Sequence, residues 1–137
     1  MKIEYSFSPR IFIRINLKGK EMTKRRVVIT GLGAVTPFGV GVEKFWNSLV
    51  EGKSGISTSE LIDIDKHVVK ISGECKNFNP DEYLDPKEAK KMDRYIQFAV
   101  IAADEAIKDA KLEEVKDVDP YKIGVIVSSA AGGFRNF

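Results

Sequence analysis

The sequence predicts an α/β fold, in which helices pack on a mixed or parallel sheet. Two short apolar runs suited to strands are found at Val27–Ile29 and Ile123–Ser129. Between them, residues 42–50 and 86–111 repeat apolar side chains at the three- and four-residue spacing of amphipathic helices. Strands that alternate with such helices are typical of the α/β class.

The composition fits one soluble domain and argues against several classes of function. The 137 residues are 43% hydrophobic, which is enough for a single domain to bury a core. The 22 basic and 20 acidic residues give a net charge of +2, which provides no global basic field for nucleic acid. No apolar run approaches the roughly 18–20 residues of a membrane helix. The single cysteine excludes an internal disulfide framework and a multi-cysteine zinc site.

The first 21 residues are interpreted as an extension outside the fold. Apolar residues at positions 11, 13, 15 and 17 follow the period of a strand, so an edge strand is the alternative. The segment does not have the pattern of a secretory signal, because Pro9, Arg10 and Arg14 interrupt the apolar stretch and no small-residue cleavage site follows. Without such a signal, we expect the protein in the cytoplasm.

The first strand, Val27–Ile29, has the β-branched composition of a strand buried on both faces. Gly31 and Gly33 follow it, and glycines there permit a tight exit from the strand or the close approach of another element. Thr36 precedes a proline, which disfavours a helical backbone at this residue. The sequence therefore predicts a loop over residues 33–41 before the first helix.

The two glycines also suggest an alternative function, a dinucleotide-binding α/β domain. That fingerprint needs a third glycine or alanine where Thr36 stands, and a helix that opens directly on the turn. Pro37, Gly39 and Gly41 intervene instead. A turn at the end of a strand, without a ligand, fits these residues better.

The first helix is predicted after Gly41, which can cap its start, and before Gly52, which suits a left-handed residue just past its end. Trp46 lies on its apolar face and is interpreted as core packing, not as a platform for a ligand. The apolar stripe comprises Val42, Phe45, Trp46, Leu49 and Val50.

The second helix has the clearest local signals. Asp85 suits the N-cap, Pro86 suits the first helical position, and Glu88 completes a capping box. The helix is expected to continue to about Lys111 and to lie across a sheet. A further strand is predicted before it, over Val68–Glu74. The predicted buried stripe comprises Met92, Ile96, Ala99, Val100, Ala103, Ile107 and Ala110.

Several of these motifs occur in the order found in one enzyme family. They are RRVVITGLGAVTPFG, FWNSLVEGKSGI, KISGECKNF over residues 70–78, the segment over residues 85–112, and the glycine-rich strand end over residues 123–133. Together they resemble the amino-terminal part of the β-ketoacyl-acyl-carrier-protein synthases. The similarity is greatest to the 3-oxoacyl-acyl-carrier-protein synthase II type, and it covers nearly everything from Met22 on.

The resemblance implies a thiolase-like fold, of which this chain supplies the first part of the amino-terminal half. Residues 22–137 then form a partial synthase domain, a mixed sheet with helices packed on it. This interpretation requires that Val27–Ile29 is buried and that the long second helix packs on another element. The implied activity is acyl transfer in fatty-acid biosynthesis, by decarboxylative condensation with malonyl-carrier protein. It implies a homodimer and no bound cofactor, since the carrier brings its own phosphopantetheine arm.

Members of this family use one cysteine and two histidines that lie later in the chain than the paired-glycine strand end. The resemblance therefore implies that the 137-residue chain is inactive alone. Cys75 and His67 are poor substitutes, because they stand at opposite ends of the predicted strand, about 25 Å apart at 3.3 Å per residue. Cys75 is interpreted as a small packed thiol and His67 as a surface residue.

A basic cluster marks the start of the second helix, at Lys87, Lys90, Lys91 and Arg94. Four cations near the positive end of a helix dipole are unfavourable by some tenths of a kcal/mol each. The cluster therefore indicates an anionic partner, with a solvated charged face as the alternative. The resemblance implies that Lys87, Lys90 and Lys91 contact the acidic carrier protein, and it assigns no such contact to Arg94. A non-catalytic carrier-binding module is the second functional alternative.

Overall fold

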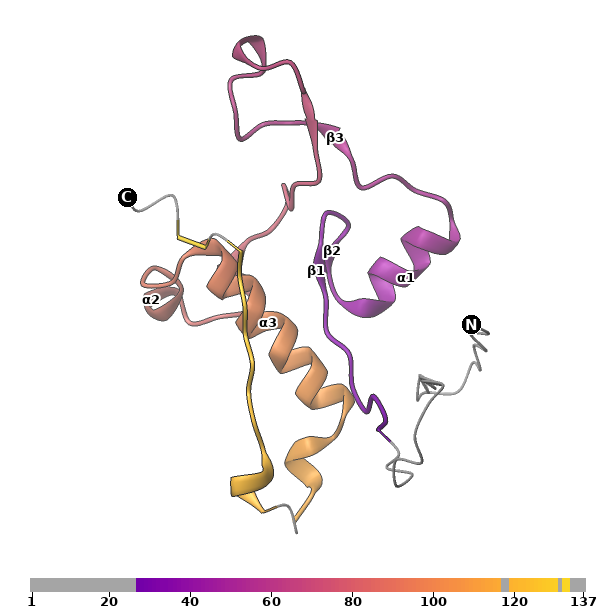
Figure 1. Cartoon of the computed structure of the whole chain (residues 1–137), viewed down its shortest axis with the longest axis vertical. Helices are drawn as coiled ribbons and strands as arrows, with labels where there is room; N and C mark the ends of the chain where they lie inside the picture. The colour runs from indigo at the N-terminus through magenta and orange to yellow at the C-terminus, as the bar shows by residue number, and fades with distance from the viewer. Residues whose placement is uncertain (1–26, 117–118, 131, 134–137) are drawn as a thin grey trace, which may run out of the picture.

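The computed structural model describes residues 27–116, 119–130 and 132–133 (Figure 1). The predicted extension, residues 1–21, lies outside the described residues. The strands are β1 (Val35–Thr36), β2 (Gly39–Val40), β3 (Ser57–Thr58) and β4 (Ile71–Ser72). The α-helices are α1 (Val42–Val50), α2 (Pro86–Ala89) and α3 (Arg94–Asp109), with short 3-10 turns at Ile64–Lys66, Pro80–Glu82, Leu112–Glu114 and Pro120–Lys122. In the described part of the chain, no helix has the length and apolarity that crossing a bilayer requires.

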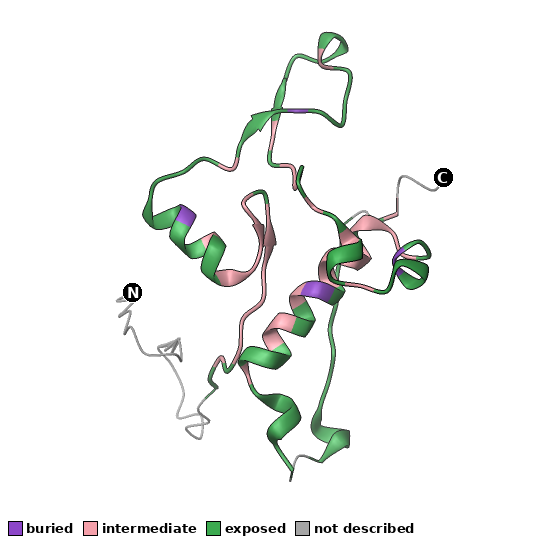
Figure 2. Ribbon diagram, turned by 180° about the vertical axis from the view of Figure 1, so that it is seen from behind, coloured by how far each residue is buried: buried purple, intermediate pink, exposed green. Residues whose placement is uncertain are grey.

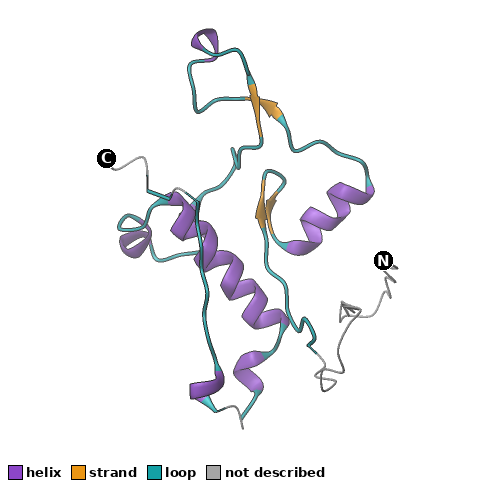
Figure 3. Ribbon diagram, in the orientation of Figure 1, coloured by secondary structure: helices purple, strands orange, loops and turns teal. Residues whose placement is uncertain are grey.

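The α/β class is confirmed, but the arrangement of the strands differs from the prediction. The described strands form two separate antiparallel pairs, β1 with β2 and β3 with β4, in place of one mixed sheet (Figure 3). In the first pair, Val35 lies opposite Val40 and Thr36 lies opposite Gly39. The Thr36 hydroxyl closes the turn, since it accepts from the Phe38 amide and donates to the Gly39 carbonyl, both at 3.2 Å. The predicted loop before the first helix is thus a tight hairpin.

Helix α1 begins and ends as its flanking glycines predict. Gly41 precedes it with a φ of 110°, and Gly52 follows it in the left-handed region with a φ of 69°. The Gly52 amide donates to Leu49 O at 3.0 Å, and the Lys53 amide donates to Ser48 O at 2.9 Å. These two bonds form a Schellman motif, which satisfies carbonyls that the helix end would leave free.

The apolar stripe of α1 was predicted to be core, and this prediction is wrong for the described part of the chain. Val50 is 70% exposed, and Trp46 is also exposed. Phe45 is half-buried, with its ring centroid 6.3 Å from that of Phe38. The buried residue is Ser48, whose hydroxyl donates to the Lys44 carbonyl one turn earlier. Figure 2 accordingly colours most of α1 as exposed. Amphipathic spacing identifies a face that can be covered, but whether other elements cover it depends on tertiary structure.

Strand β4 falls inside the predicted strand but is shorter. Only Ile71–Ser72 pairs, with Ser57–Thr58 of β3, and Val68 is fully exposed. The Glu74 carboxylate ties this pair to the loop that follows β3. It accepts from the hydroxyls of Ser59 and Ser72, and from the Glu60 amide at 3.0 Å. These donors lower the pKa of Glu74 to about 2, with the Ser59 hydroxyl as the largest cause.

The stability of the β3–β4 pairing is expected to depend on pH. The carboxylate of Glu74 has a pKa of about 2 in the folded chain and 4.5 in its unperturbed state. The contribution of this carboxylate to the stability of the β3–β4 pairing is therefore complete above pH 4.5 and is lost as the pH falls toward 2. We expect an NMR titration of the Glu74 side-chain carbon to give a midpoint well below 4.5. In the variant E74Q, the amides of this loop should exchange faster at neutral pH. A midpoint near 4.5 would show that the two serines do not hold the carboxylate in solution.

The predicted long second helix is two helices. Asp85 is the N-cap of α2 as predicted, since its Oδ1 accepts from the amides of Lys87 at 2.9 Å and Glu88 at 3.2 Å. Helix α2 ends after one turn, at Ala89. Asp93 then adopts an extended backbone as the residue before α3, with φ −63° and ψ 153°. An extended residue breaks the helical hydrogen-bond ladder, and periodicity alone does not reveal this.

Helix α3 packs on the extended segment that leads into β1, mostly through residues outside the predicted stripe, although Ala110 of that stripe lies against Gly31. Gly31 and Gly33 lie against its backbone, where a Cβ atom would meet the carbonyl oxygens of Ala106 and Ala102 at 2.1 and 1.8 Å. Ile101 is 5% exposed, whereas Ile107 of the predicted stripe is exposed. Of the two uses foreseen for these glycines, the close approach of another element is the one observed. The requirement that the helix packs on another element is met, by the segment before β1 and by β1 itself.

The two apolar runs predicted as strands, the first of them buried on both faces, are not strands in this structure. Val27 is 83% exposed and Ile126 is 96% exposed, and neither run belongs to the described sheets. Ile123–Ser129 forms an extended trace, the long yellow segment of Figure 1. The requirement that Val27–Ile29 is buried is therefore not met. A strand buried on both faces needs hydrogen-bonded neighbours and a layer on each side, and the described residues supply neither to these runs.

Candidate functional site

The three lysines predicted to bind a partner gather at the end of α2. We call Lys87, Lys90 and Lys91 the basic turn. All three are exposed, and Lys90 is the C-cap of α2. The Lys91 ammonium pairs with the Glu88 carboxylate at 2.6 Å. In the described part of the chain, no ion pair joins the ammonium groups of Lys87 and Lys90 to an acid. They remain available to a partner.

The break between α2 and α3 changes the electrostatic argument for this site. Lys90 and Lys91 follow the last residue of a one-turn helix, so they do not lie in the first turns of a long one. The carbonyl end of a helix favours cations, and the predicted conflict with the dipole is absent for these two residues. The case for an anionic partner then depends on the exposure of the three lysines, and on the finding that two of them have no ion-pair partner in the described ranges.

Arg94 is half-buried and does not belong to the basic turn. Its guanidinium donates to the Cys75 carbonyl and lies 5.1 Å from the ring centroids of both Phe78 and Phe98. These contacts fix α3 against the loop before α2 and give the guanidinium partners within the chain. The structure thus accounts for Arg94 without a partner.

In the part of the chain that the structure describes, no hydrogen bond joins the Cys75 thiol to His67. Burial raises the pKa of the Cys75 thiol, and the nearby Arg94 guanidinium offsets part of this effect. A raised pKa keeps the sulfur protonated at neutral pH, and the thiol is a poor nucleophile. His67 is exposed, beyond the 3-10 turn Ile64–Lys66. In the described ranges, no group of three or more histidine, cysteine or acidic side chains is placed to hold a metal ion.

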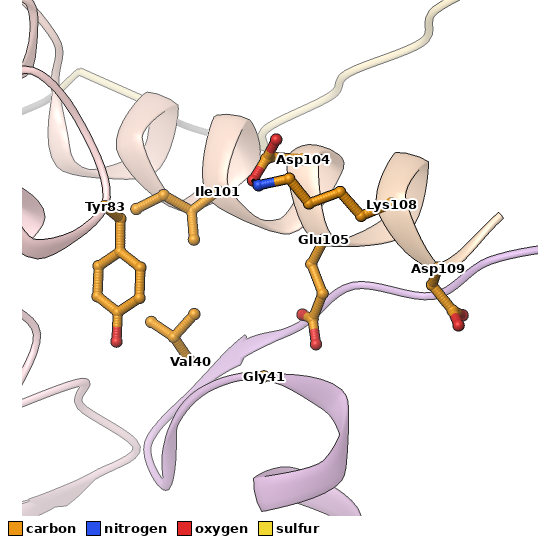
Figure 4. Close-up of a pocket in the computed structure, with 8 residues that line it drawn as sticks. All are labelled: Val40, Gly41, Tyr83, Ile101, Asp104, Glu105, Lys108 and Asp109. Atoms are coloured by element: carbon orange, nitrogen blue, oxygen red, sulfur yellow. Dashed lines mark hydrogen bonds and ion pairs between the residues drawn. The ribbon is translucent and has the colours of Figure 1, made fainter. Parts of the chain in front are cut away.

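A shallow cavity of about 410 Å³ lies between the β1–β2 hairpin and α3 (Figure 4). Val40, Tyr83 and Ile101 form its apolar end, and Glu105 points from α3 toward Gly41. The complete lining is Val40, Gly41, Tyr83, Ile101, Asp104, Glu105, Lys108 and Asp109.

Two acids of α3, which the sequence analysis missed, hold the segment before α1. The Glu105 carboxylate accepts from the Ala34 amide at 2.9 Å with one oxygen and from the Val42 amide at 2.8 Å with the other. One turn later, Asp109 accepts from the Leu32 amide at 2.9 Å. Val42 is the first residue of α1, so Glu105 also places a negative charge at the positive end of that helix. An acidic pair four residues apart, each acid followed by an alanine, was the signal available in the sequence.

These contacts argue against the dinucleotide alternative. A pyrophosphate at the Gly31-x-Gly33 turn would need free amides and a helix that opens on the turn. The amides of Leu32 and Ala34 already donate to carboxylates, whose charge would repel a phosphate. The helix begins only at Val42. The turn serves the packing of α3.

Comparisons with known proteins give one consistent result. A family model for the N-terminal domain of β-ketoacyl synthases matches residues 24–136. The chain is 43% identical over 113 residues to a 3-oxoacyl-[acyl-carrier-protein] synthase 2 of Staphylococcus aureus (strain N315), covering 82% of this chain and 27% of that protein. It is 41% identical over 114 residues to the protein of the same name from Synechocystis sp. (strain ATCC 27184 / PCC 6803 / Kazusa), covering 83% of this chain and 27% of that protein. The chain thus spans about a quarter of the length of these curated relatives.

Proposed function

Because the chain belongs to the β-ketoacyl synthase family, through the N-terminal domain of that family, we propose that it acts as part of a 3-oxoacyl-[acyl-carrier-protein] synthase. The observation that carries this proposal is the match over residues 24–136, together with the identity to two relatives of that name. The match supports the function even though Val27–Ile29 is exposed here, because the family model compares amino-acid sequences and says nothing about burial. The proposed reaction is acyl transfer, the decarboxylative condensation of an acyl chain with malonyl-carrier protein in fatty-acid biosynthesis.

Within this activity, we propose that the basic turn binds the acyl carrier protein. Lys87, Lys90 and Lys91 are exposed, and the first two have no ion-pair partner among the described residues. Clustered ammonium groups of this kind suit the surface of an acidic protein, where they raise the association rate and orient the encounter. Cys75 and His67 are assigned no catalytic role in this proposal.

The remaining parts of the proposal concern the complete protein. The substrate chain arrives on the phosphopantetheine arm of the carrier, so no bound cofactor is invoked. We place the protein in the cytoplasm as a homodimer. Residues 1–21 are proposed to lie outside the family fold, and the family match, which starts at residue 24, supports this boundary.

Reversing the charge of the basic turn is expected to weaken carrier binding. In the double variant K90E/K91E, two attractive contacts become repulsive. Exposed pairs contribute roughly 0.2–1 kcal/mol each, so we expect an affinity loss of about tenfold at low salt that shrinks as salt is added. Isothermal titration of the chain with acyl carrier protein measures this loss directly.

The matched control is K116E/K122E, which reverses two exposed lysines elsewhere in the chain. Each reversal removes two units of positive charge, so both double variants change the net charge from +2 to −2. The control should bind the carrier nearly as well as the unmodified chain. Equal affinities for all three proteins at low salt, or equal losses in the two variants, would refute a specific role for the basic turn.

A further inference from the structure

Gln97 holds the main chain on both sides of the two central lysines of the basic turn. Its side-chain amide donates to the Ala89 carbonyl at 2.9 Å and to the Met92 carbonyl at 3.3 Å. In the sequence, these two carbonyls directly flank Lys90 and Lys91. One side chain of α3 therefore connects both ends of the exposed dilysine to that helix.

The residues around Gln97 also hold the backbone of the basic turn in place. The Ala89 carbonyl lies at the end of α2 and accepts from the Met92 amide at 3.1 Å, so the Gln97 side chain is its second donor. Ala89 is itself only 2% exposed, so the start of the turn is packed against the rest of the chain. Gln97 lies in the first turns of α3, where its backbone amide donates to the Asp93 carbonyl at 3.1 Å. The backbone of the turn is thus fixed, while the lysine side chains extend into solvent.

We propose that Gln97 is a positioning residue for carrier binding, which acts by holding Lys90 and Lys91 in the arrangement that the carrier meets. This inference rests on the proposed carrier-binding role of the basic turn. A turn fixed in advance loses less conformational entropy on docking than a mobile one. Gln97 itself needs no contact with the carrier.

The test is a double-mutant cycle between Gln97 and the two lysines. The variant Q97M keeps the length of the side chain and removes its donor. We expect Q97M to lower carrier affinity about fivefold in the otherwise unmodified chain, and to have no further effect in the K90E/K91E background, because residues that act through one another are not additive. In the K116E/K122E background, the fivefold loss should persist. Hydrogen exchange should accelerate at the amides of residues 90–93.

Each alternative result has a distinct meaning. If K90E/K91E binds the carrier as well as the unmodified chain, the proposed function of the turn fails and this inference fails with it. If K90E/K91E weakens binding while Q97M does not, the function stands and the role of Gln97 is refuted. The role is also refuted if Q97M lowers affinity equally in the presence and absence of the lysine reversals, because that result is a general structural effect.

A second variant protects the test against a failure to fold. Q97N keeps the amide but shortens the side chain by one methylene, which takes the donor out of reach of the two carbonyls. It should show the same pattern of coupling as Q97M. Urea unfolding of both variants should give midpoints close to that of the unmodified chain. A loss of affinity that followed the loss of stability across the two variants would overturn the inference.

Discussion

The substitution of Gly33 by alanine is expected to destabilise the chain by at least about 3 kcal/mol, at the upper end of what overpacking costs. The new Cβ would lie 1.8 Å from the Ala102 carbonyl oxygen and 2.8 Å from its carbon. Both atoms belong to the backbone of α3, which can move away only if the helix breaks or the whole segment leaves it. Urea unfolding followed by circular dichroism measures the change.

The control for this substitution is G124A. Among the described residues, nothing lies within 4 Å of the position that a Cβ would take at Gly124, and this glycine does not have a left-handed backbone. We expect a change of less than about 0.5 kcal/mol there, as for other surface substitutions. If G33A and G124A unfolded at the same urea concentration, Gly33 would not approach α3 this closely in solution.

The second large effect is expected from the variant E105Q, which preserves size and removes one acceptor. The two oxygens of Glu105 accept from the amides of Ala34 and Val42. A glutamine has one acceptor oxygen, so its NH₂ group must face one of these amide donors. One partly buried amide loses its partner and the other loses a charged acceptor, which together cost about 2–3 kcal/mol. The same urea measurement applies.

Glu114 offers a matched acid for comparison. It is exposed in the 3-10 turn Leu112–Glu114, and the variant E114Q should change stability by less than about 0.5 kcal/mol. Amide exchange adds a local measurement, since E105Q should release the amides of Ala34 and Val42 while it leaves those of β3 and β4 protected. Stability equal to that of the unmodified chain would show that the carboxylate does not bridge the two amides.

The features that the sequence predicted well are set by neighbouring residues. Gly41, Gly52 and Asp85 mark helix ends, and each acts through backbone geometry or hydrogen bonds within three residues. Such signals are complete in a short window of sequence. The hairpin at Thr36–Gly39 was foreseen as a loop for the same reason, because a proline restricts its own neighbour.

The features that the sequence predicted badly depend on distant partners. Val27–Ile29 and Ile123–Ser129 have the composition of buried strands, yet composition does not supply the neighbours that bury a strand. The apolar stripe of α1 is exposed for the same reason. At the end of α2, the Ala89 carbonyl accepts from the side chain of Gln97, eight residues away, and this contact lies outside the window used to judge a cap.

The candidate site was predicted in part. The positions of Lys87, Lys90 and Lys91 came from the family resemblance, and the structure shows that they are exposed. Their role in carrier binding stays a prediction. The electrostatic reason first given for it was wrong for Lys90 and Lys91, since it assumed a continuous helix. Glu105 was missed because an exposed acid and an acid that accepts from a distant backbone look alike in sequence.

The face that α3 presents to the Gly31–Gly33 segment also limits how the length of this chain can vary in evolution. Ala102, Glu105 and Asp109 contact that segment from one side of the helix. Inserting or deleting one residue among them would rotate all that follows by about 100°, since a helix has 3.6 residues per turn. The acids would then point away from their amides. The exposed loop between β3 and β4 has no helical face whose orientation must be kept. We therefore expect length differences among relatives to occur in this loop and to be absent from α3.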